Sequence, residues 1–403
     1  MKTKQLYSKS VSYLKFLCEE IPERCVGSEG NRKATSLFER EITQCGWVTE
    51  SSELDVIDWQ SEGATLQCED RYFNVLTSPY SLGCTVQAPL SDATCIEELE
   101  QREICGTILL LHGGIAQEQL MPKNFVFYNP IEHQRIISLL EEKQPAAIIA
   151  ATGRNPALAG GVYPFPLIED GDFNIPSVYT TEEEGKETAS YIGKPIRLES
   201  LSKRIPSKAY NVTARKGNNT AGRIVITAHI DSKKGSPGAI DNATGVVTLL
   251  LLAELLEDYY GDKMLGIVAL NGEDYYAQPG QMDYVRKNES FFNRIIMNIN
   301  IDGAGYKEGK TVLSFFDLPD TILTNAYEML SRFENLTEGK QWYQGDHSIF
   351  IQYGCPAIAV SSQWFIDNIE KQDISHTPKD NTEIVDCQKI VELAEALNWF
   401  IRK

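Results

Sequence analysis

A histidine and two aspartates follow one predicted strand in the second half of the chain. His229 and Asp231 end the apolar run 223–230, and Asp241 follows a loop rich in Gly and Pro. Imidazole and carboxylate groups are common zinc ligands. A carboxylate beside a ligating histidine can accept its second ring N–H and fix the tautomer. The pattern indicates a metal site, while a solvated histidine and a helix-capping aspartate are the alternative for this stretch alone.

Further acidic and imidazole groups stand in equivalent places later in the chain. Four side chains follow predicted strands: Glu273 and Asp274 after 263–271, Asp302 after 294–301, and His376 in a loop after 355–361. Adjacent carboxylates repel one another unless a cation or a proton separates them. Taken singly, each could be an acidic turn, a capping residue or a surface histidine. Together with His229 and Asp241, they offer two histidines and three aspartates as metal ligands. Asp241 could bridge two metals, and Glu273 is left over.

The elements that would position these side chains alternate between strand and helix. Beyond residue 205, strands are predicted at 210–216, 223–230, 263–271, 294–301, 311–316 and 355–361, and helices at 243–258, 280–288, 320–333 and 387–402. This alternation is typical of an α/β fold with a mixed, largely parallel sheet flanked by helices. Open sheets of this class bind ligands at the carboxyl ends of their strands.

The first half of the chain has a different character. Residues 1–46 predict two helices, and 47–59 predicts an edge strand. Residues from about 60 to 205 predict separate strand and helix units, including strands at 107–111, 146–151 and 195–198, and here His112 and His133 are expected to be structural or surface residues. We therefore expect one domain from residues 1–55 and 206–403, with residues 56–205 inserted.

Composition narrows the class of protein. The formal net charge is −18, which disfavours nucleic acid and anionic membranes as partners. We see neither a signal peptide nor an apolar run long enough to span a membrane. Nine scattered cysteines without a C-x-x-C motif favour reduced thiols and a cytoplasmic location. A few disulfides among Cys68, Cys84, Cys95 and Cys105 are the alternative.

The ordered motifs resemble a known family. The sequence H-x-D, D-N-A-x-G, E-D, D-G and H-T-P-x-D is similar to the co-catalytic di-zinc aminopeptidases of clan MH, whose relatives include glutamate carboxypeptidase and the transferrin receptor. The similarity covers residues 205–403, and residues 27–31 resemble the start of the same domain. The resemblance implies a zinc exopeptidase fold of the phosphorylase/hydrolase-like type. It also implies that residues 56–205 form an inserted α+β protease-associated-like domain.

The resemblance assigns a role to each candidate residue. It implies two zinc ions per chain, with His229 and Asp302 on one ion, Asp274 and His376 on the other, and Asp241 between them. Glu273 would be the general base for a zinc-activated water. Asp231 would orient His229. These roles together imply hydrolysis of a peptide bond.

Other positions match the family less closely. An oxyanion-stabilising tyrosine is expected in the stretch 341–347, where the usual register places Trp342, so Tyr343 is the candidate donor one residue further on. Asp346 and His347 resemble a loop motif that lines the site, with a structural pair as the alternative. Asp380 would orient His376. The family also usually has a cis peptide bond after the bridging aspartate, here Asp241-Asn242.

The expected activity is removal of N-terminal residues from peptides. A related zinc carboxypeptidase or deacylase is an alternative, but those enzymes carry a long lid, and only 73 residues separate Asp302 from His376. A non-catalytic binding homologue is a second alternative, which the complete ligand set disfavours. Glutaminyl cyclisation would need only one zinc. The oligomeric state and the preferred substrate side chain are not encoded in these patterns.

Overall fold

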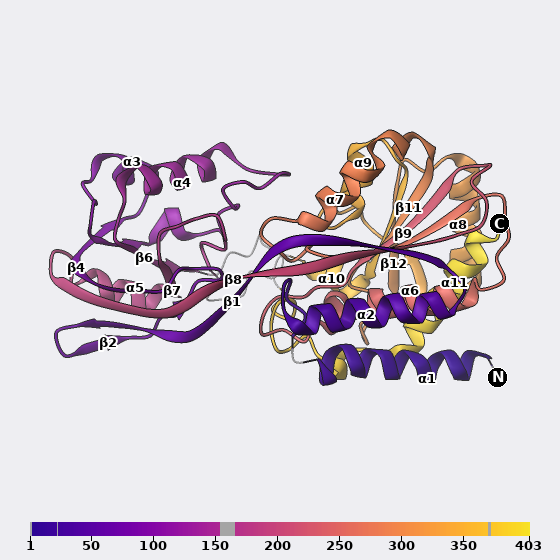
Figure 1. Cartoon of the computed structure of the whole chain (residues 1–403), viewed down its shortest axis with the longest axis horizontal. Helices are drawn as coiled ribbons and strands as arrows, with labels where there is room; N and C mark the ends of the chain where they lie inside the picture. The colour runs from indigo at the N-terminus through magenta and orange to yellow at the C-terminus, as the bar shows by residue number, and fades with distance from the viewer. Residues whose placement is uncertain (1, 22, 154–165, 370–371) are drawn as a thin grey trace. The chain divides into compact units, whose positions relative to one another are not determined.

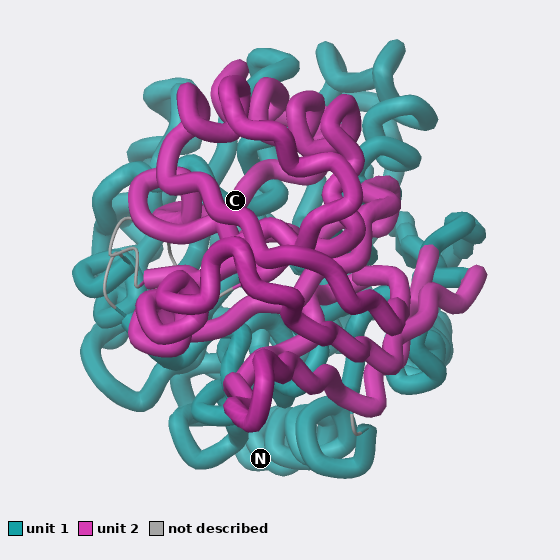
Figure 2. The backbone as a smooth tube through the Cα atoms, turned by 90° about the vertical axis from the view of Figure 1, so that its left-hand side faces the viewer, with its two compact units in different colours: residues 1–56, 208–403 teal, residues 57–207 magenta. Residues whose placement is uncertain are grey.

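The computed structural model describes residues 2–21, 23–153, 166–369 and 372–403. The chain divides into two compact units, which Figure 2 shows in teal and magenta. Unit 1 comprises Met1–Val56 and Lys208–Lys403, and unit 2 comprises Ile57–Ser207. The chain passes from one unit to the other within two long strands, β1 (Val48–Cys68) and β8 (Pro195–Lys216).

Unit 1 contains a mixed, largely parallel sheet, which confirms the predicted fold class. Its strand order is β13 (Leu336–Glu338), β12 (Thr311–Phe316), β14 (Ala357–Ser362), β11 (Ile295–Ile301), β9 (Arg223–His229), β10 (Met264–Leu270) and the end of β8. The central strands β14, β11, β9 and β10 are parallel to one another. Their carboxyl ends therefore meet at one edge of the sheet.

Helices cover both faces of this sheet (Figure 1). The helices of unit 1 are α1 (Lys2–Lys15), α2 (Glu29–Gln44), α6 (Thr244–Leu255), α7 (Pro279–Asn288), α8 (Asp320–Arg332), α9 (His347–Gln352), α10 (Gln363–Asn368) and α11 (Cys387–Ile401), with short helical segments η1 (Phe16–Glu20), η3 (Ala239–Ala243), η4 (Glu289–Arg294) and η5 (Thr382–Ile384). Helix α6 is apolar on all sides because it packs against α1, α2 and α11 as well as β9. Ser28 begins α2, since its side chain accepts a hydrogen bond from Asn31 N.

Strand β9 illustrates how the sheet is anchored. Its residues Ile224, Ile226 and Ala228 belong to the large apolar core under α6. Because successive side chains of a strand point to opposite faces, this register fixes the direction of His229 at the strand end. The core thus determines the orientation of the first candidate metal ligand.

Unit 2 has its own sheet and its own apolar core. The strand order is the start of β8, then β4 (Cys84–Ala93), β5 (Ile108–Leu111), β6 (Ala147–Thr152), β7 (Ser177–Thr181) and β3 (Leu76–Thr77), while β2 (Arg71–Phe73) pairs with β1. Its helices are α3 (Ile96–Gln101), η2 (Gly113–Ala116), α4 (Ile131–Lys143) and α5 (Glu182–Ala189). His112 pairs with Asp92, and His133 accepts a hydrogen bond from Met121 N, so both histidines contact their own unit.

Three predicted strands are shorter than the two strands that contain them. The expected separate strands 195–198 and 210–216 are parts of the single strand β8. The edge strand expected at 47–59 continues as β1 to Cys68. Both strands are rich in polar and exposed residues, so the apolar alternation that marks a half-buried strand is interrupted. The short elements β13, α9 and α10 were not predicted.

Two features bear on the environment of the chain. Within the described residues, every helix is too short or too polar to cross a bilayer. All nine cysteines carry thiols in the structure and none takes part in a disulfide.

Candidate metal centre

The predicted ligands gather at the carboxyl edge of the unit 1 sheet. His229 is the last residue of β9 and lies beside Leu270, the last residue of the parallel strand β10. Glu273 and Asp274 follow β10 directly, and Asp302 follows β11. Residues from three neighbouring strand ends thus share one edge, as the parallel register requires.

Asp241 lies between the two histidines. Its Oδ1 is 3.1 Å from His229 Nε2, and its Oδ2 is 3.3 Å from His376 Nε2. Asp302 Oδ1 is 3.6 Å from His229 Nε2, and Asp274 Oδ1 is 3.0 Å from His376 Nε2. Each oxygen of one carboxylate therefore faces a different histidine, and each histidine has a second carboxylate beside it. The peptide bond Asp241-Asn242 is cis, as expected.

The donor atoms fit a metal ion. Ligand atoms on a tetrahedral zinc with bonds of about 2.0 Å lie about 3.3 Å apart, close to the separations seen here. One donor atom each from His229, Asp241 and Asp274 lie within 4.8 Å of one another. Within the described residues, both ring nitrogens of His229 and Asp274 Oδ2 are buried without a hydrogen bond of standard geometry. Buried polar atoms normally have partners, so His229 Nε2 and Asp274 Oδ2 have the chemistry of metal ligands.

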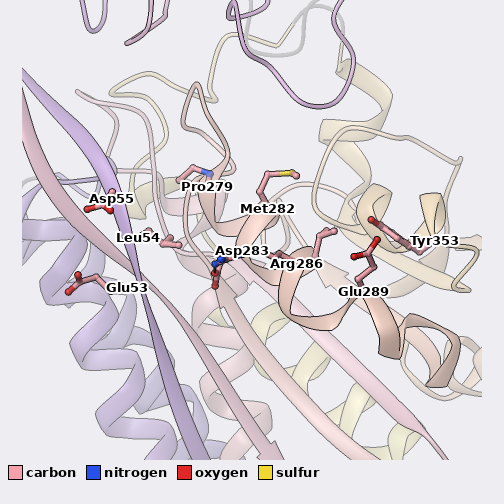
Figure 3. Close-up of a pocket in the computed structure, with 10 residues that line it drawn as sticks. Glu53, Leu54, Asp55, Pro279, Met282, Asp283, Arg286, Glu289 and Tyr353 are labelled. Carbon is pink, nitrogen blue, oxygen red and sulfur yellow. Dashed lines mark hydrogen bonds and ion pairs between the residues drawn. The ribbon is translucent and has the colours of Figure 1, made fainter.

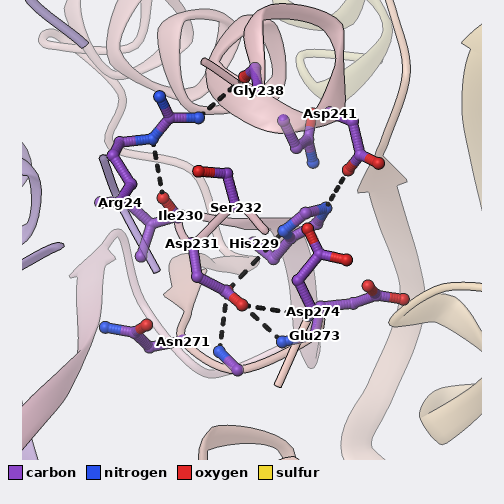
Figure 4. Close-up of polar contacts among 12 residues, drawn as sticks. Arg24, His229, Ile230, Asp231, Ser232, Gly238, Asp241, Asn271, Glu273 and Asp274 are labelled. Atoms are coloured by element: carbon purple, nitrogen blue, oxygen red, sulfur yellow. Dashed lines mark hydrogen bonds and ion pairs between the residues drawn. The ribbon is translucent and has the colours of Figure 1, made fainter. Parts of the chain in front are cut away.

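Asp231 organises the loop after β10 (Figure 4). Its Oδ1 accepts hydrogen bonds from Gly272 N at 2.7 Å and Glu273 N at 3.3 Å, and its Oδ2 accepts one from Asp274 N at 3.0 Å. The same Oδ1 is 3.7 Å from His229 Nδ1. One buried carboxylate thus contacts two ligand-bearing segments, which supports a positioning role broader than the predicted orientation of His229.

The site has a strongly negative potential. Burial alone would lower the pKa of His229, but Asp231, Asp241 and Asp302 raise it well above its usual value. Burial also opposes protonation of His376, yet its neighbours Asp274 and Asp241 raise its pKa well above the usual value. Carboxylates gathered in this way favour positive charge, which a bound metal can supply in place of protons.

Glu273 differs from the other carboxylates of the site. Burial raises its pKa well above the usual value, and nearby Asp274 and Asp302 act in the same direction against the opposing effect of His229. Its side chain is partly exposed, and Figure 4 shows it beside Asp274. Glu273 is thus a partly accessible carboxyl group with an elevated pKa beside the proposed metal ligands.

Asp380 contacts a different residue from the one expected. Its Oδ1 accepts a hydrogen bond from Ile240 N at 2.7 Å, and its Oδ2 accepts one from Asp241 N at 3.0 Å. Asp380 therefore holds the backbone of Asp241, the central proposed ligand. We expected this side chain to orient His376, but its oxygens bond to the backbone amides instead.

Tyr343 is 61% exposed, and its hydroxyl donates to Gln341 Oε1 at 3.4 Å. Its ring packs edge-on against Phe316. Trp342, in contrast, is half-buried. Gly345 lies close to both the Trp342 ring and Asp302 Oδ2, since a Cβ added at Gly345 would lie within 3.3 Å of each. The assignment of Tyr343 as oxyanion donor stays a prediction.

Asp346 and His347 are buried at the start of α9. Asp346 Oδ1 accepts a hydrogen bond from Gln281 Nε2 at 2.8 Å, and burial raises the pKa of Asp346 to about 7. His347 Nε2 lies 2.8 Å from Trp342 O. The pair thus joins α7, α9 and the loop that contains Trp342, which supports the structural alternative for this motif.

His347 gives a test of stability against pH. Burial lowers the pKa of His347 to about 4, whereas the unfolded chain binds this proton near pH 6.5. The contribution of His347 to stability therefore decreases as the pH falls from about 6.5 to about 4, by at most about 3 kcal/mol. His347→Gln should lose less stability than the natural protein between about pH 7 and about pH 4.5.

Urea unfolding in the presence of a chelator, followed by tryptophan fluorescence, measures this difference. Four of the five tryptophans lie in unit 1, so the signal reports mainly on the unit that contains His347. Because Asp346 is present in both proteins, its own titration contributes to both curves. Equal losses of stability in the two proteins would contradict the prediction.

Sequence reasoning missed a buried polar network behind the site. The side-chain amides of Asn31 and Asn271 exchange two hydrogen bonds, each of 2.9 Å. Asn271 N also donates to Asn211 Oδ1, and Asn211 Nδ2 donates to Gly280 O. The network joins the start of α2 to the loop before Glu273. Each asparagine alone is typical of a loop or cap. The one sequence signal for this network is Asn271, a polar residue at the end of the apolar run 263–271.

A separate cavity of about 690 Å³ opens on unit 1 (Figure 3). Its walls come from β1, α7 and the residues after α9: Glu53, Leu54, Asp55, Pro279, Met282, Asp283, Val285, Arg286, Glu289 and Tyr353. Three of its acidic groups have basic partners, since Lys208 pairs with Glu53 and Asp55, and Arg286 pairs with Asp283. None of the predicted site residues lines it, so the cavity lies apart from the metal centre.

Comparison with known proteins points to one family. Residues 211–400 match Peptidase family M28. Aminopeptidase YwaD from Bacillus subtilis is 22% identical over 242 residues, which cover 57% of this chain and 51% of the relative. A vacuolar membrane protease from Pyrenophora tritici-repentis is 33% identical over 124 residues, 29% of this chain and 12% of the relative. The chain thus spans about half or less of the length of these relatives.

Solved structures share the fold over nearly the whole chain. An aminopeptidase from Aneurinibacillus sp. strain AM-1 is similar with a TM-score of 0.77 and 21% identity, covering 99% of this chain and 94% of that one. A zinc aminopeptidase from Bacillus subtilis is similar with a TM-score of 0.74 and 18% identity, covering 98% and 94%. The fold class predicted from the sequence is the fold of these proteins.

Proposed function

We propose that this chain is a zinc-dependent aminopeptidase that removes N-terminal residues from peptides. The observation that carries the proposal is the position of Asp241, whose two oxygens face His229 Nε2 and His376 Nε2 at 3.1 and 3.3 Å. A shared carboxylate between two histidine sites is the arrangement that a pair of metal ions requires. The match of residues 211–400 to a peptidase family supports the choice of a peptide bond as the substrate.

The proposed ligand sets follow the short distances. His229 and Asp302 would hold one zinc, Asp274 and His376 would hold the other, and Asp241 would bridge them. His229 Nε2 and Asp274 Oδ2, which are buried without a hydrogen bond of standard geometry, support this assignment. Zinc, when bound, acidifies a water molecule and polarises the scissile carbonyl.

The remaining steps belong to side chains of this protein. Glu273 would accept the proton of the attacking water and deliver it to the nitrogen of the leaving peptide. Asp231 would keep His229 in one tautomer and hold the backbone amides of Gly272 and Asp274 in place. Tyr343 is our proposed hydrogen-bond donor to the developing oxyanion.

We further propose an organisation for the whole chain. Residues 1–55 and 206–403 would be the catalytic domain, and residues 56–205 an inserted protease-associated-like domain, in keeping with the compact units 1–56 with 208–403 and 57–207. A cytoplasmic location is proposed from the scattered cysteines, which are unlinked in the structure.

Reconstitution with zinc tests the proposal. We expect about two equivalents of zinc per chain by elemental analysis, as in two-metal hydrolases. We also expect hydrolysis of aminoacyl arylamides that is lost with a chelator and restored by zinc. N-acetylated forms of the same arylamides are the matched control and should not react. Absence of bound zinc would reject the enzyme, and turnover of only N-acylated or C-terminal substrates would favour the deacylase or carboxypeptidase alternative.

A further inference from the structure

Arg24 is a buried cation behind the metal centre. It lies between η1 and α2, and it is 1% exposed. Its guanidinium donates hydrogen bonds to four main-chain carbonyls: Leu17 O at 2.8 Å, Ile230 O at 3.2 Å, Pro237 O at 2.6 Å and Gly238 O at 2.7 Å. A buried charge is tolerated when hydrogen bonds replace its lost hydration. Three of the four carbonyls belong to the segment 230–238.

The segment 230–238 connects two proposed ligands. Ile230 directly follows His229, and Gly238 directly precedes η3, which contains Asp241. By bonding to both ends of the segment, Arg24 fixes how far the end of β9 lies from the start of η3 (Figure 4). The separation of 3.1 Å between His229 Nε2 and Asp241 Oδ1 depends on that spacing.

A carboxylate holds the residues that follow this segment. Asp380 accepts hydrogen bonds from the N–H groups of Ile240 and Asp241, while Arg24 donates to the carbonyls of Pro237 and Gly238. The cation binds the oxygens and the anion binds the amides of adjoining residues. Both the carbonyl groups before Asp241 and the amide groups at Ile240 and Asp241 are thereby held by buried charged side chains.

We infer that Arg24 is a positioning residue of the metal centre, which sets the spacing of His229 and Asp241 through the backbone of segment 230–238. The inference rests on the proposed zinc site. Among the residues that the structure describes, the guanidinium bonds to these four carbonyls and to Cys18 Sγ, and to none of the proposed ligand side chains, so it would act through the segment. A purely structural arginine that ties η1 to the core would affect stability and leave zinc affinity unchanged.

The test compares zinc affinity with stability. Arg24→Met removes the donors, and we expect zinc affinity, measured by competition with a chromophoric chelator, to weaken by about 10–100-fold, the range for residues behind a metal ligand. The increase in melting temperature on adding zinc should shrink accordingly. Arg32→Met is the matched control, because Arg32 also donates to main-chain carbonyls, those of Gly27 and Lys208, which lie outside segment 230–238. The control should bind zinc like the natural protein.

Two further variants keep the inference testable if Arg24→Met fails to fold. Arg24→Lys keeps the charge but has only three donors on one nitrogen, which cannot reach all four carbonyls, so weaker zinc binding is still expected. In Arg24→Ala, guanidinium at millimolar concentration should restore zinc affinity, and ammonium at equal ionic strength should not. Zinc affinity within twofold of the natural protein in folded Arg24 variants would overturn the inference. A natural protein that binds no zinc would instead reject the proposed function.

Discussion

Glu273→Gln is expected to lower kcat by about 10²–10⁴-fold, the usual contribution of a general acid or base. The carboxamide has nearly the same shape as the carboxylate but cannot accept the proton of the attacking water. Glu273 is absent from the proposed ligand sets, so the variant should still bind about two equivalents of zinc. The effect on KM should be small, because the substitution removes a proton acceptor needed in the transition state.

The measurement combines steady-state rates on an aminoacyl arylamide with zinc content from the same preparation. Glu289→Gln is the matched control, since it removes the same charge from an exposed position at the start of η4. That variant should keep the natural rate. Unchanged turnover in Glu273→Gln would contradict its role as base, and loss of zinc would show that it is a ligand instead.

Asp241→Asn should have the largest effect on metal binding. The substitution keeps the size of the side chain but removes the charge that faces both His229 and His376. Because the bridging group would contact both ions, we expect zinc affinity to fall by more than about 100-fold, beyond the range for residues outside the ligand set. Hydrolysis of the arylamide should fall below detection.

Asp258→Asn is the control for this experiment, because Asp258 is an aspartate on the surface of unit 1 that pairs with Arg402. It should bind zinc and turn over substrate like the natural protein. Isothermal titration of both variants with zinc gives affinity and stoichiometry together. Two equivalents bound to Asp241→Asn at natural affinity would refute the bridging role.

The positions of His229, Asp274 and Asp302 could be predicted because each lies at or just after the end of a strand with a clear apolar pattern. Strands β9, β10 and β11 are buried runs of branched residues, and their boundaries agree with the predictions to within a residue or two. Once the strands are parallel, their carboxyl ends must meet, so His229, Asp274 and Asp302 must approach one another. The chemistry then follows from the residue types.

The contacts behind the ligands could not be predicted in the same way. Arg24 lies 206 positions from Ile230, and Asn31 lies 240 positions from Asn271. No local pattern of charge or hydrophobicity marks such pairs, because their partners are main-chain carbonyls and amides set by the tertiary fold. Asp380 was assigned to the nearby His376 for this reason, although its oxygens bind the backbone at Asp241.

The discontinuous build of unit 1 also constrains its assembly during synthesis. Helices α1 and α2 emerge from the ribosome before the rest of unit 1, yet Arg24 cannot find three of its four carbonyl partners until more than 200 further residues have been made. Until then the apolar faces of both helices lack the strands and helices that cover them. Contacts between residues so far apart in sequence form slowly. A nascent chain therefore exposes these apolar faces, to which chaperones can bind, while residues 57–207 are being translated.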